Sequence, residues 1–225
     1  MSQAFTLQDS HALDDLSTYL SRAGRVEDGS VRLIATSGVL AVYVAIFYPS
    51  GLLDESPTVL GLRTFSLPEK ETFDVVVPVG SLLQRIANRK SEVTDVAAPV
   101  SVTLPMQVHT VSWAAISPPR GGWTPLPGTT SGLLDEVARA GIDAVAGAVP
   151  TGMGEQIVHR VRSEVWGQPI RGLEHVPAGA SFAAFSLGFL SGDEAVQIFE
   201  TGPWTRLTTK RGHVLAKRRA WTLAR

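Results

Sequence analysis

The chain has 225 residues, of which 44% are hydrophobic and 18% charged, a composition typical of a globular protein with one large domain or two small ones. It contains no cysteine, which excludes disulfides, thiolate metal sites and thiol nucleophiles. The last 25 residues hold seven of the 20 basic residues and no acidic residue, whereas the other 200 hold 13 basic and 21 acidic residues. This asymmetry favours a partner that is a polyanion or an acidic protein surface.

The start of the chain lacks the basic and apolar regions of a signal peptide. The longest apolar run, residues 39–48, is about half of the ~20 residues that a membrane span requires. We therefore expect a soluble, cytoplasmic protein without a membrane partner.

The first expected helix covers residues 10–23, where leucines recur on one face. Ser10 is expected to cap it and Gly24 to end it, and Asp14 and Asp15 are expected in its first turn. A second, shorter helix should follow Pro78.

Six apolar runs in the first half have the length and composition of β-strands. They cover residues 31–35, 39–47, 59–67, 73–77, 100–104 and 108–116. The first two runs are separated by a turn sequence and predict a hairpin, and the last two are expected to pair. Residues 1–117 are therefore predicted to form a strand-rich α+β module with a mostly antiparallel sheet.

Residues 118–128 are the expected boundary, because seven of these eleven residues are Pro or Gly. Neither a helix nor a strand is expected to continue through them. We assign residues 118–130 to a Pro/Gly-rich connector.

The remaining residues, 131–225, are predicted to form a helical module that ends in a basic β-hairpin. Helices are expected at residues 131–140, with a continuation over 142–149, at 155–166 and at 180–190, and strands at 195–200, 204–208 and 213–217. Lys210, Arg211 and Gly212 are expected at the tip of the hairpin.

Three helices followed by a basic hairpin are also the order of a winged helix, whose third helix enters the DNA major groove. The hairpin fits, because Arg206, Lys210 and Arg211 would contact phosphates. The third helix does not fit, because it offers only Ser181 and Ser186 to the bases. A solvated basic hairpin on a structural domain is the competing interpretation.

The candidate residues for nucleic-acid or partner binding are the basic side chains and the histidine of the last strands. They are Arg206, Lys210, Arg211, His213, Lys217, Arg218 and Arg219. A weaker candidate is an anion-binding loop at Gly152 and Gly154, before the helix at 155–166. That loop lacks the lysine of a P-loop, so a plain connector between helices is the alternative.

No catalytic residue, cofactor site or metal site is expected. The sequence Ala-Phe-Ser-Leu-Gly at 184–188 is similar to a nucleophile elbow, but only Asp193 and His213 follow it. None of the five histidines has a partner at metal-ligand spacing, so we expect surface or structural histidines, with His159 on the outward face of its helix. Trp123, in its Gly/Pro loop, is expected either to be exposed for a partner or to fold back over the core.

Four segments, PTVLGLRTF, PPRGGW, EVWG and GPWTRLTTKRGHVL, resemble an uncharacterised protein family of high-GC actinobacteria, which implies no function. The order of elements in residues 3–117 is also similar to one half of a DNA sliding clamp. In sliding clamps the helices that face DNA are basic, whereas residues 10–23 carry two acids and only Arg22. We therefore treat this resemblance as one of topology without function.

The sequence thus predicts a non-catalytic binding protein that uses its basic C-terminal hairpin to contact nucleic acid or an acidic protein surface. One alternative is a structural homo-oligomer in which the tail docks on another copy. The other is an enzyme that holds a small anionic substrate near Gly152, Gly154, Arg120 and His213.

Overall fold

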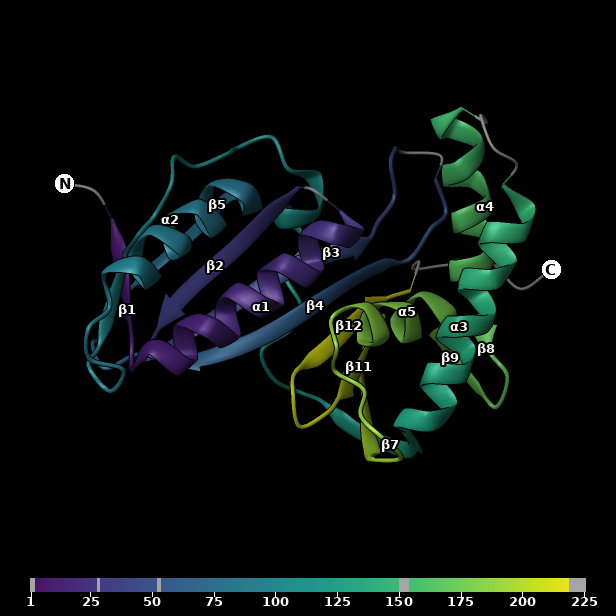
Figure 1. The fold of residues 1–225 in the computed structure, drawn as a ribbon. Coiled ribbons are helices and arrows are strands. Elements are labelled where there is room, and N and C mark those ends of the chain that lie inside the picture. Colours follow the sequence, from purple (N-terminus) through teal and green to yellow (C-terminus); the bar gives the residue numbers. More distant parts are fainter. Residues whose placement is uncertain (1–2, 28, 52–53, 150–153, 219–225) are drawn as a thin grey trace. The chain divides into compact units, whose positions relative to one another are not determined.

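The computed structural model describes residues 3–27, 29–51, 54–149 and 154–218 (Figure 1). Contacts within the chain define two compact units, which we call the first unit (residues 1–45 and 62–117) and the second unit (residues 46–61 and 118–225). Helices and an antiparallel sheet are both present, which confirms the α+β class. Residues 46–61 group with the C-terminal part, a long-range contact that local patterns do not reveal. The division into a module at 1–117, a connector at 118–130 and a module at 131–225 stays a prediction.

The first unit combines a helix pair with strands. Its elements are β1 (Ala4–Leu7), α1 (Ser10–Val26), β2 (Ser30–Thr36), β3 (Val39–Phe47), β4 (Thr58–Ser66), β5 (Phe73–Pro78), α2 (Val79–Glu92), β6 (Val100–Thr103) and a 3-10 helix, η1 (Ser112–Ala115). The strand order is β5-β2-β3-β4, and β1 pairs separately with β6. Helices α1 and α2 lie side by side (Figure 1). Strands β3 and β4 contribute residues to both units.

Helix α1 begins and ends differently from the prediction. Asp9, not Ser10, caps it, because the Asp9 carboxylate accepts a hydrogen bond from the Ala12 amide (2.8 Å). The helix continues past Gly24 to Val26. Asp14 and Asp15 lie beyond the first turn, where they form ion pairs with Lys90 and Arg63 instead of stabilising the helix start.

The predicted strand at 108–116 is wrong. Residues 104–111 have no regular structure, and η1 follows them. The Val108 amide donates to the Val76 carbonyl (2.8 Å), but this single bond does not extend into a strand ladder. Strand β6 therefore pairs with β1, and its predicted pairing with 108–116 is also wrong.

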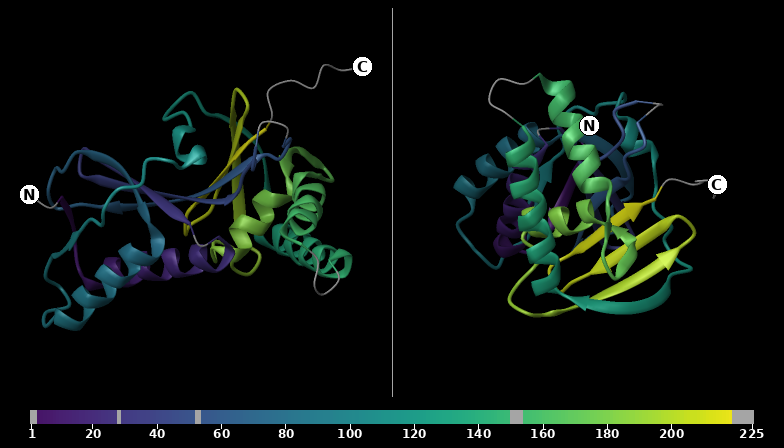
Figure 2. Two further views of the ribbon diagram at one scale, coloured as in Figure 1. Left: turned by 90° about the horizontal axis from the view of Figure 1, so that it is seen from above. Right: turned by 90° about the vertical axis from the view of Figure 1, so that its right-hand side faces the viewer.

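The second unit has helices on one face of a sheet. Its further elements are β7 (Thr124–Thr130), α3 (Ser131–Ala148), α4 (Glu155–Gly167), β8 (Pro169–Ile170), β9 (Leu173–Pro177), α5 (Ala178–Ser186), β10 (Ala195–Thr201), β11 (Trp204–Thr208) and β12 (His213–Lys217). The strand order continues from β4 as β12-β11-β10-β7. Figure 2 shows β10–β12 in yellow with β7 along one edge, and α3 packs on α5.

Strand β7 contradicts the prediction that no strand runs through 118–128. It is an edge strand bonded only to β10, so Pro125 and Pro127 remove no bond from an inner ladder. The register shifts between Val196 and Ile198, and there Gly128 is required, because a Cβ would lie 2.8 Å from the Val196 carbonyl oxygen. The Pro and Gly residues that predicted a loop therefore belong to an irregular edge strand.

The three helices of the second unit were predicted, with a difference in α5. Helix α3 continues through Gly141 as predicted, and a Cβ there would lie 2.2 Å from a ring carbon of Trp166. Helix α5 ends at Ser186 rather than Leu190, because Gly188 has a left-handed backbone (φ 71°) and its amide bonds to the Phe185 carbonyl. The short β8–β9 hairpin was not predicted.

Candidate partner-binding surface on the C-terminal hairpin

The β11–β12 hairpin has the predicted bounds and tip. The Thr209 amide and hydroxyl both donate to the Gly212 carbonyl (3.0 Å each), and the Arg211 amide donates to the Thr209 hydroxyl oxygen (3.1 Å). A Cβ on Gly212 would lie 2.5 Å from the Phe189 ring. The turn is therefore held in one conformation, with Lys210 and Arg211 at its end.

The tip cations share one acid. Lys210 Nζ lies 3.7 Å and Arg211 Nη1 lies 3.4 Å from the carboxylate of Glu194. The Lys210 side chain is 79% exposed, so its ion pair is worth little. Arg218 similarly faces Glu200 at 3.9 Å. These three predicted contact residues therefore carry less free positive charge than the sequence indicated.

Arg206 has different surroundings. It lies in the middle of β11, not near the tip, and its guanidinium carbon is 4.6 Å from the Trp123 ring centre and 4.5 Å from the Phe199 ring centre. In the part of the chain that the structure describes, Arg206 has no ion pair, and its buried Nε has no hydrogen-bond partner. Burial lowers the pKa of Arg206. We call Trp123, Phe199 and Arg206 the Arg206 cluster.

The loop that carries Trp123 folds back onto the sheet of its own unit. Its indole Nε1 donates a hydrogen bond to the Pro119 carbonyl (3.1 Å), and its ring packs against Arg206. The segments PPRGGW and GPWTRLTTKRGHVL, which carry the family resemblance, thus meet at this cluster.

Two other predicted residues lie on the same face of the sheet as Arg206. His213, Leu215 and Lys217 alternate along β12, and Leu215 is the register partner of Arg206. His213 Nδ1 lies 3.1 Å from the Thr208 hydroxyl, and burial, with the charge of Arg206, lowers the pKa of His213. At neutral pH His213 is therefore uncharged, and it adds no cation to this face. Arg219 lies outside the described residues.

The anion-binding loop is only partly described. Gly152 lies outside the described residues, and Gly154 precedes α4 without a side-chain cap. Arg120 is exposed in the loop before β7. Among the described residues, no hydrogen bond or ion pair joins Gly154, Arg120 and His213, so nothing in the geometry assembles a site for a small anion.

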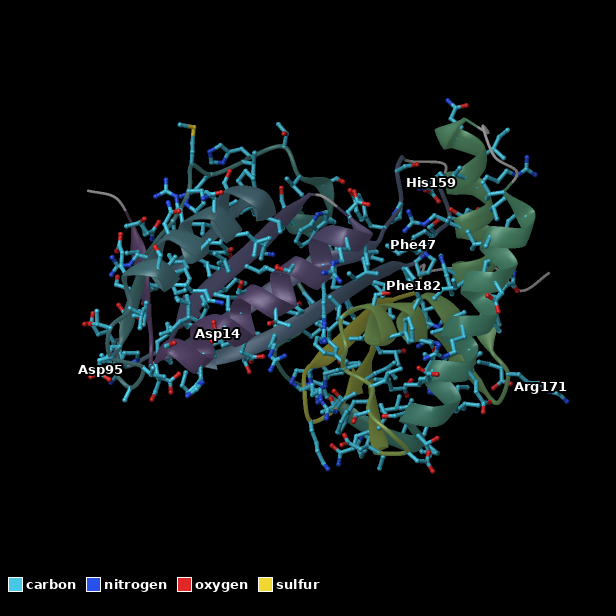
Figure 3. The ribbon with its side chains drawn as sticks, viewed as in Figure 1. Asp14, Phe47, Asp95, His159, Arg171 and Phe182 are labelled. Atoms are coloured by element: carbon cyan, nitrogen blue, oxygen red, sulfur yellow. The ribbon has the colours of Figure 1, made fainter. Side chains whose placement is uncertain are left out.

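A polar network that the sequence did not reveal links Ser50, Asp54 and Ser56 to α4 within the second unit. His159 Nε2 lies 3.6 Å from Asp54 Oδ2, His159 Nδ1 lies 3.5 Å from the Ser163 hydroxyl, and the Phe47 ring stacks on the imidazole (Figure 3). His159 is partly exposed (36% of its side chain) and also contacts Phe47 and Asp54, so the predicted outward position is only partly correct.

This network resembles a Ser–His–Asp triad but does not have its geometry. The Ser56 hydroxyl lies 2.5 Å from Asp54 and 2.9 Å from Ser163, and both imidazole contacts are long for hydrogen bonds. Burial raises the pKa of Asp54, but hydrogen bonds from Ser56 and Ser50 outweigh it and lower that pKa to about 2. The network anchors the segment to α4.

Over the ranges that the structure describes, no three His, Asp or Glu side chains converge as ligands of a metal ion. Within the same ranges, no helix combines the length and apolar character needed to cross a lipid bilayer.

Comparisons with known proteins divide the chain in two. Residues 1–106 match the family model of a domain of unknown function (DUF8010), and residues 118–221 match that of a second domain of unknown function (DUF8185). No curated protein sequence matches the chain. The matches are consistent with the expected uncharacterised family, whereas an actinobacterial origin stays a prediction.

Solved structures of bacterial sliding clamps have a similar fold. The DNA polymerase III subunit beta of Bartonella birtlesii matches with a TM-score of 0.55 at 12% identity, over 98% of this chain and 66% of that protein. Those of Borrelia burgdorferi (0.54, 7% identity, 96% and 64%) and Pseudomonas aeruginosa (0.51, 13% identity, 99% and 66%) are also similar. The chain thus spans just under two thirds of these clamps, and the likeness extends well beyond residues 3–117.

Proposed function

We propose that this protein is a non-catalytic, cytoplasmic binding protein of clamp-like fold that contacts nucleic acid through its C-terminal hairpin. The observation that carries the proposal is Arg206, a half-buried cation without an acid partner among the described residues. Placing a charge against aromatic rings costs solvation free energy, and a phosphate brought to it would recover part of that cost. Lys217 on the same face also has no described ion pair and would add a second contact.

Helices α3 and α5 of the second unit support this location, because neither offers a basic surface. Helix α3 carries three acids, Asp135, Glu136 and Asp143, against Arg139, which pairs with Asp135. Helix α5, the third helix of a winged-helix interpretation, is buried along most of its length. The hairpin is thus favoured to act without a recognition helix.

The test is the salt dependence of binding. Fluorescence anisotropy with labelled DNA should show binding at 50 mM salt that weakens steeply as salt rises. Three to four phosphate contacts predict a slope of about −3 in log K against log salt for duplex DNA. The variant Arg206→Ala/Lys210→Ala/Arg211→Ala should lose most of the affinity and flatten the slope.

A matched control is Arg85→Ala/Arg89→Ala/Lys90→Ala on α2, which removes three cations from the first unit. It should bind as the native chain does. No binding at low salt, or equal losses in both variants, would contradict the proposal.

An acidic protein surface, including that of another copy, is the second candidate. The tip favours it, because Glu194 already shows how Lys210 and Arg211 hold a carboxylate. Self-association that is lost in the hairpin variant, measured by sedimentation equilibrium without DNA, would support this candidate and the homo-oligomer alternative.

A further inference from the structure

One face of the second unit's sheet carries an aromatic ring beside an arginine. Phe199 on β10, Arg206 on β11 and Leu215 on β12 are register partners in one row across three adjacent strands, and because Leu215 is buried, Phe199 and Arg206 are the accessible part of the row. The neighbours Thr205 and Leu207 are buried on the opposite face, and Thr205 bonds to the His175 carbonyl there. The Trp123 ring packs against the guanidinium of Arg206.

We propose that this face binds single-stranded nucleic acid, with Arg206 contacting a phosphate and the rings of Trp123 and Phe199 stacking against unpaired bases. This inference rests on the proposed function and deepens it by naming the state of the strand.

The chemistry of the Arg206 cluster distinguishes single strands from duplexes. Unpaired bases expose their ring faces and stack on aromatic side chains, whereas the bases of a duplex already stack on one another. Trp123 and Phe199 are half-buried, so part of each ring is accessible. An arginine held against two rings has a fixed orientation, and its planar guanidinium can bond two phosphate oxygens at once.

The other cations fit a strand that follows the sheet better than a duplex. Lys217 lies two residues beyond Leu215 on the same face of β12, about 7 Å along the strand. Duplex binding would depend more on the projecting tip, where Lys210 and Arg211 must first leave Glu194. A flexible single strand can instead approach Arg206 without displacing an acid.

The experiment compares three labelled probes by anisotropy at 50 mM salt. They are a 12-nucleotide oligothymidylate, its duplex with oligodeoxyadenylate, and a polyglutamate peptide. The single strand should bind at least tenfold more tightly than the duplex, and polyglutamate should bind more weakly than either. Binding of the single strand should also quench tryptophan fluorescence, and less so in Trp123→Phe.

Two variants locate the site without removing its net charge. Arg206→Lys keeps the charge but loses the planar contact, and Trp123→Leu removes a ring; each should weaken single-strand binding about tenfold. Phe199→Leu serves as a second ring variant if Trp123→Leu does not fold, as judged by circular dichroism. Lys210→Ala, a single change at the tip, should weaken it less than threefold.

The outcomes separate this inference from the proposed function. Equal, salt-sensitive binding of the single strand and the duplex would overturn the inference and leave the proposed function standing. Single-strand binding unchanged by Arg206→Lys and by the ring variants would overturn the location. Binding of polyglutamate above both DNA probes, or binding of no probe, would overturn both.

Discussion

Arg32 in the first unit and Arg206 in the second both lie in inner strands of the sheet, but their surroundings are opposite. The Arg32 guanidinium makes a bidentate pair with Asp74 (2.8 and 2.7 Å) and also donates to the Ala114 carbonyl and the Ser117 hydroxyl. The hydrogen bond to Asp74 raises the pKa of Arg32. Arg206 lies against two rings, and burial lowers its pKa.

The comparison separates two uses of a buried arginine. Arg32 has a described partner for each nitrogen and ties β2 to β5 and η1, so it has little left to offer a ligand. Arg206 bonds to no acid among the described residues, and its charge is a cost to the isolated fold. An arginine of the second kind has guanidinium nitrogens left to offer an anion, which is why the proposed contact is placed at Arg206.

The helix pairs of the two units also differ, in how closely they approach. At Gly24 in α1 a Cβ would lie 3.6 Å from a Val79 methyl, an ordinary contact. At Gly141 in α3 a Cβ would overlap the Trp166 ring, which is stacked on Phe182 with ring centres 4.5 Å apart. The packing in the second unit therefore requires a glycine at position 141, whereas the packing in the first unit would accept an alanine at position 24.

The substitution Gly141→Ala should have the largest effect on stability. The added methyl group must displace a fixed indole, and overpacking of this kind costs about 1–3 kcal/mol. Gly24→Ala is the matched control and should stabilise α1 by about 0.5–1 kcal/mol, because alanine restricts the unfolded chain and favours helix. Urea denaturation measures both, and equal effects of the two variants would contradict the comparison.

Removing Arg32 should mainly lower stability, whereas removing Arg206 should mainly weaken binding. Arg32→Ala leaves Asp74 and the Ala114 carbonyl without their donor and should lower the free energy of unfolding by about 2 kcal/mol, with DNA binding unchanged. Arg206→Met should change it by less than 1 kcal/mol and abolish most of the binding. Chemical denaturation and anisotropy on the same samples provide the readout. A large loss of stability in Arg206→Met would make Arg206 a structural residue.

Local sequence patterns predicted the elements whose partners are near in the chain. The strands 204–208 and 213–217 have the predicted bounds, because a hairpin is specified by its own turn and alternation. Residues 108–116 have the same apolar character but form no strand, although the Val108 amide bonds to Val76 of the edge strand β5. Strand β7 was missed for the opposite reason, since its edge position tolerates prolines that a central strand excludes.

The candidate surface was predicted only in part, because its contacts are long-range. The cluster of basic residues is visible in the sequence, but Trp123 and Arg206 are about 80 residues apart along the chain. Glu194 precedes the hairpin tip by 16 residues, and neither charge nor spacing indicates that it faces Lys210. The sequence therefore located the positive charge but not which cations are already paired.

The smallest expected effect is the pH dependence of stability that His213 contributes. Its pKa depends in part on the charge of Arg206. Burial and the nearby guanidinium lower its pKa, so the folded protein takes up this proton less readily than the unfolded chain. Above the ordinary histidine pKa of about 6.5 both states are neutral, and His213 costs nothing. As the pH falls below 6.5 the unfolded chain is protonated first, so the free energy of unfolding declines until folded His213 is protonated as well.

Between pH 7.5 and 5.5 the variant His213→Gln should therefore lose less stability than the native chain, as urea midpoints at several pH values would measure. Arg206→Met removes the charge that also lowers the pKa of His213, so its stability curve should lie between those of the native chain and of His213→Gln. If the native and His213→Gln curves coincide, the charge of Arg206 does not alter the titration of His213. The contrast between Arg32 and Arg206 would then rest on their hydrogen bonds alone.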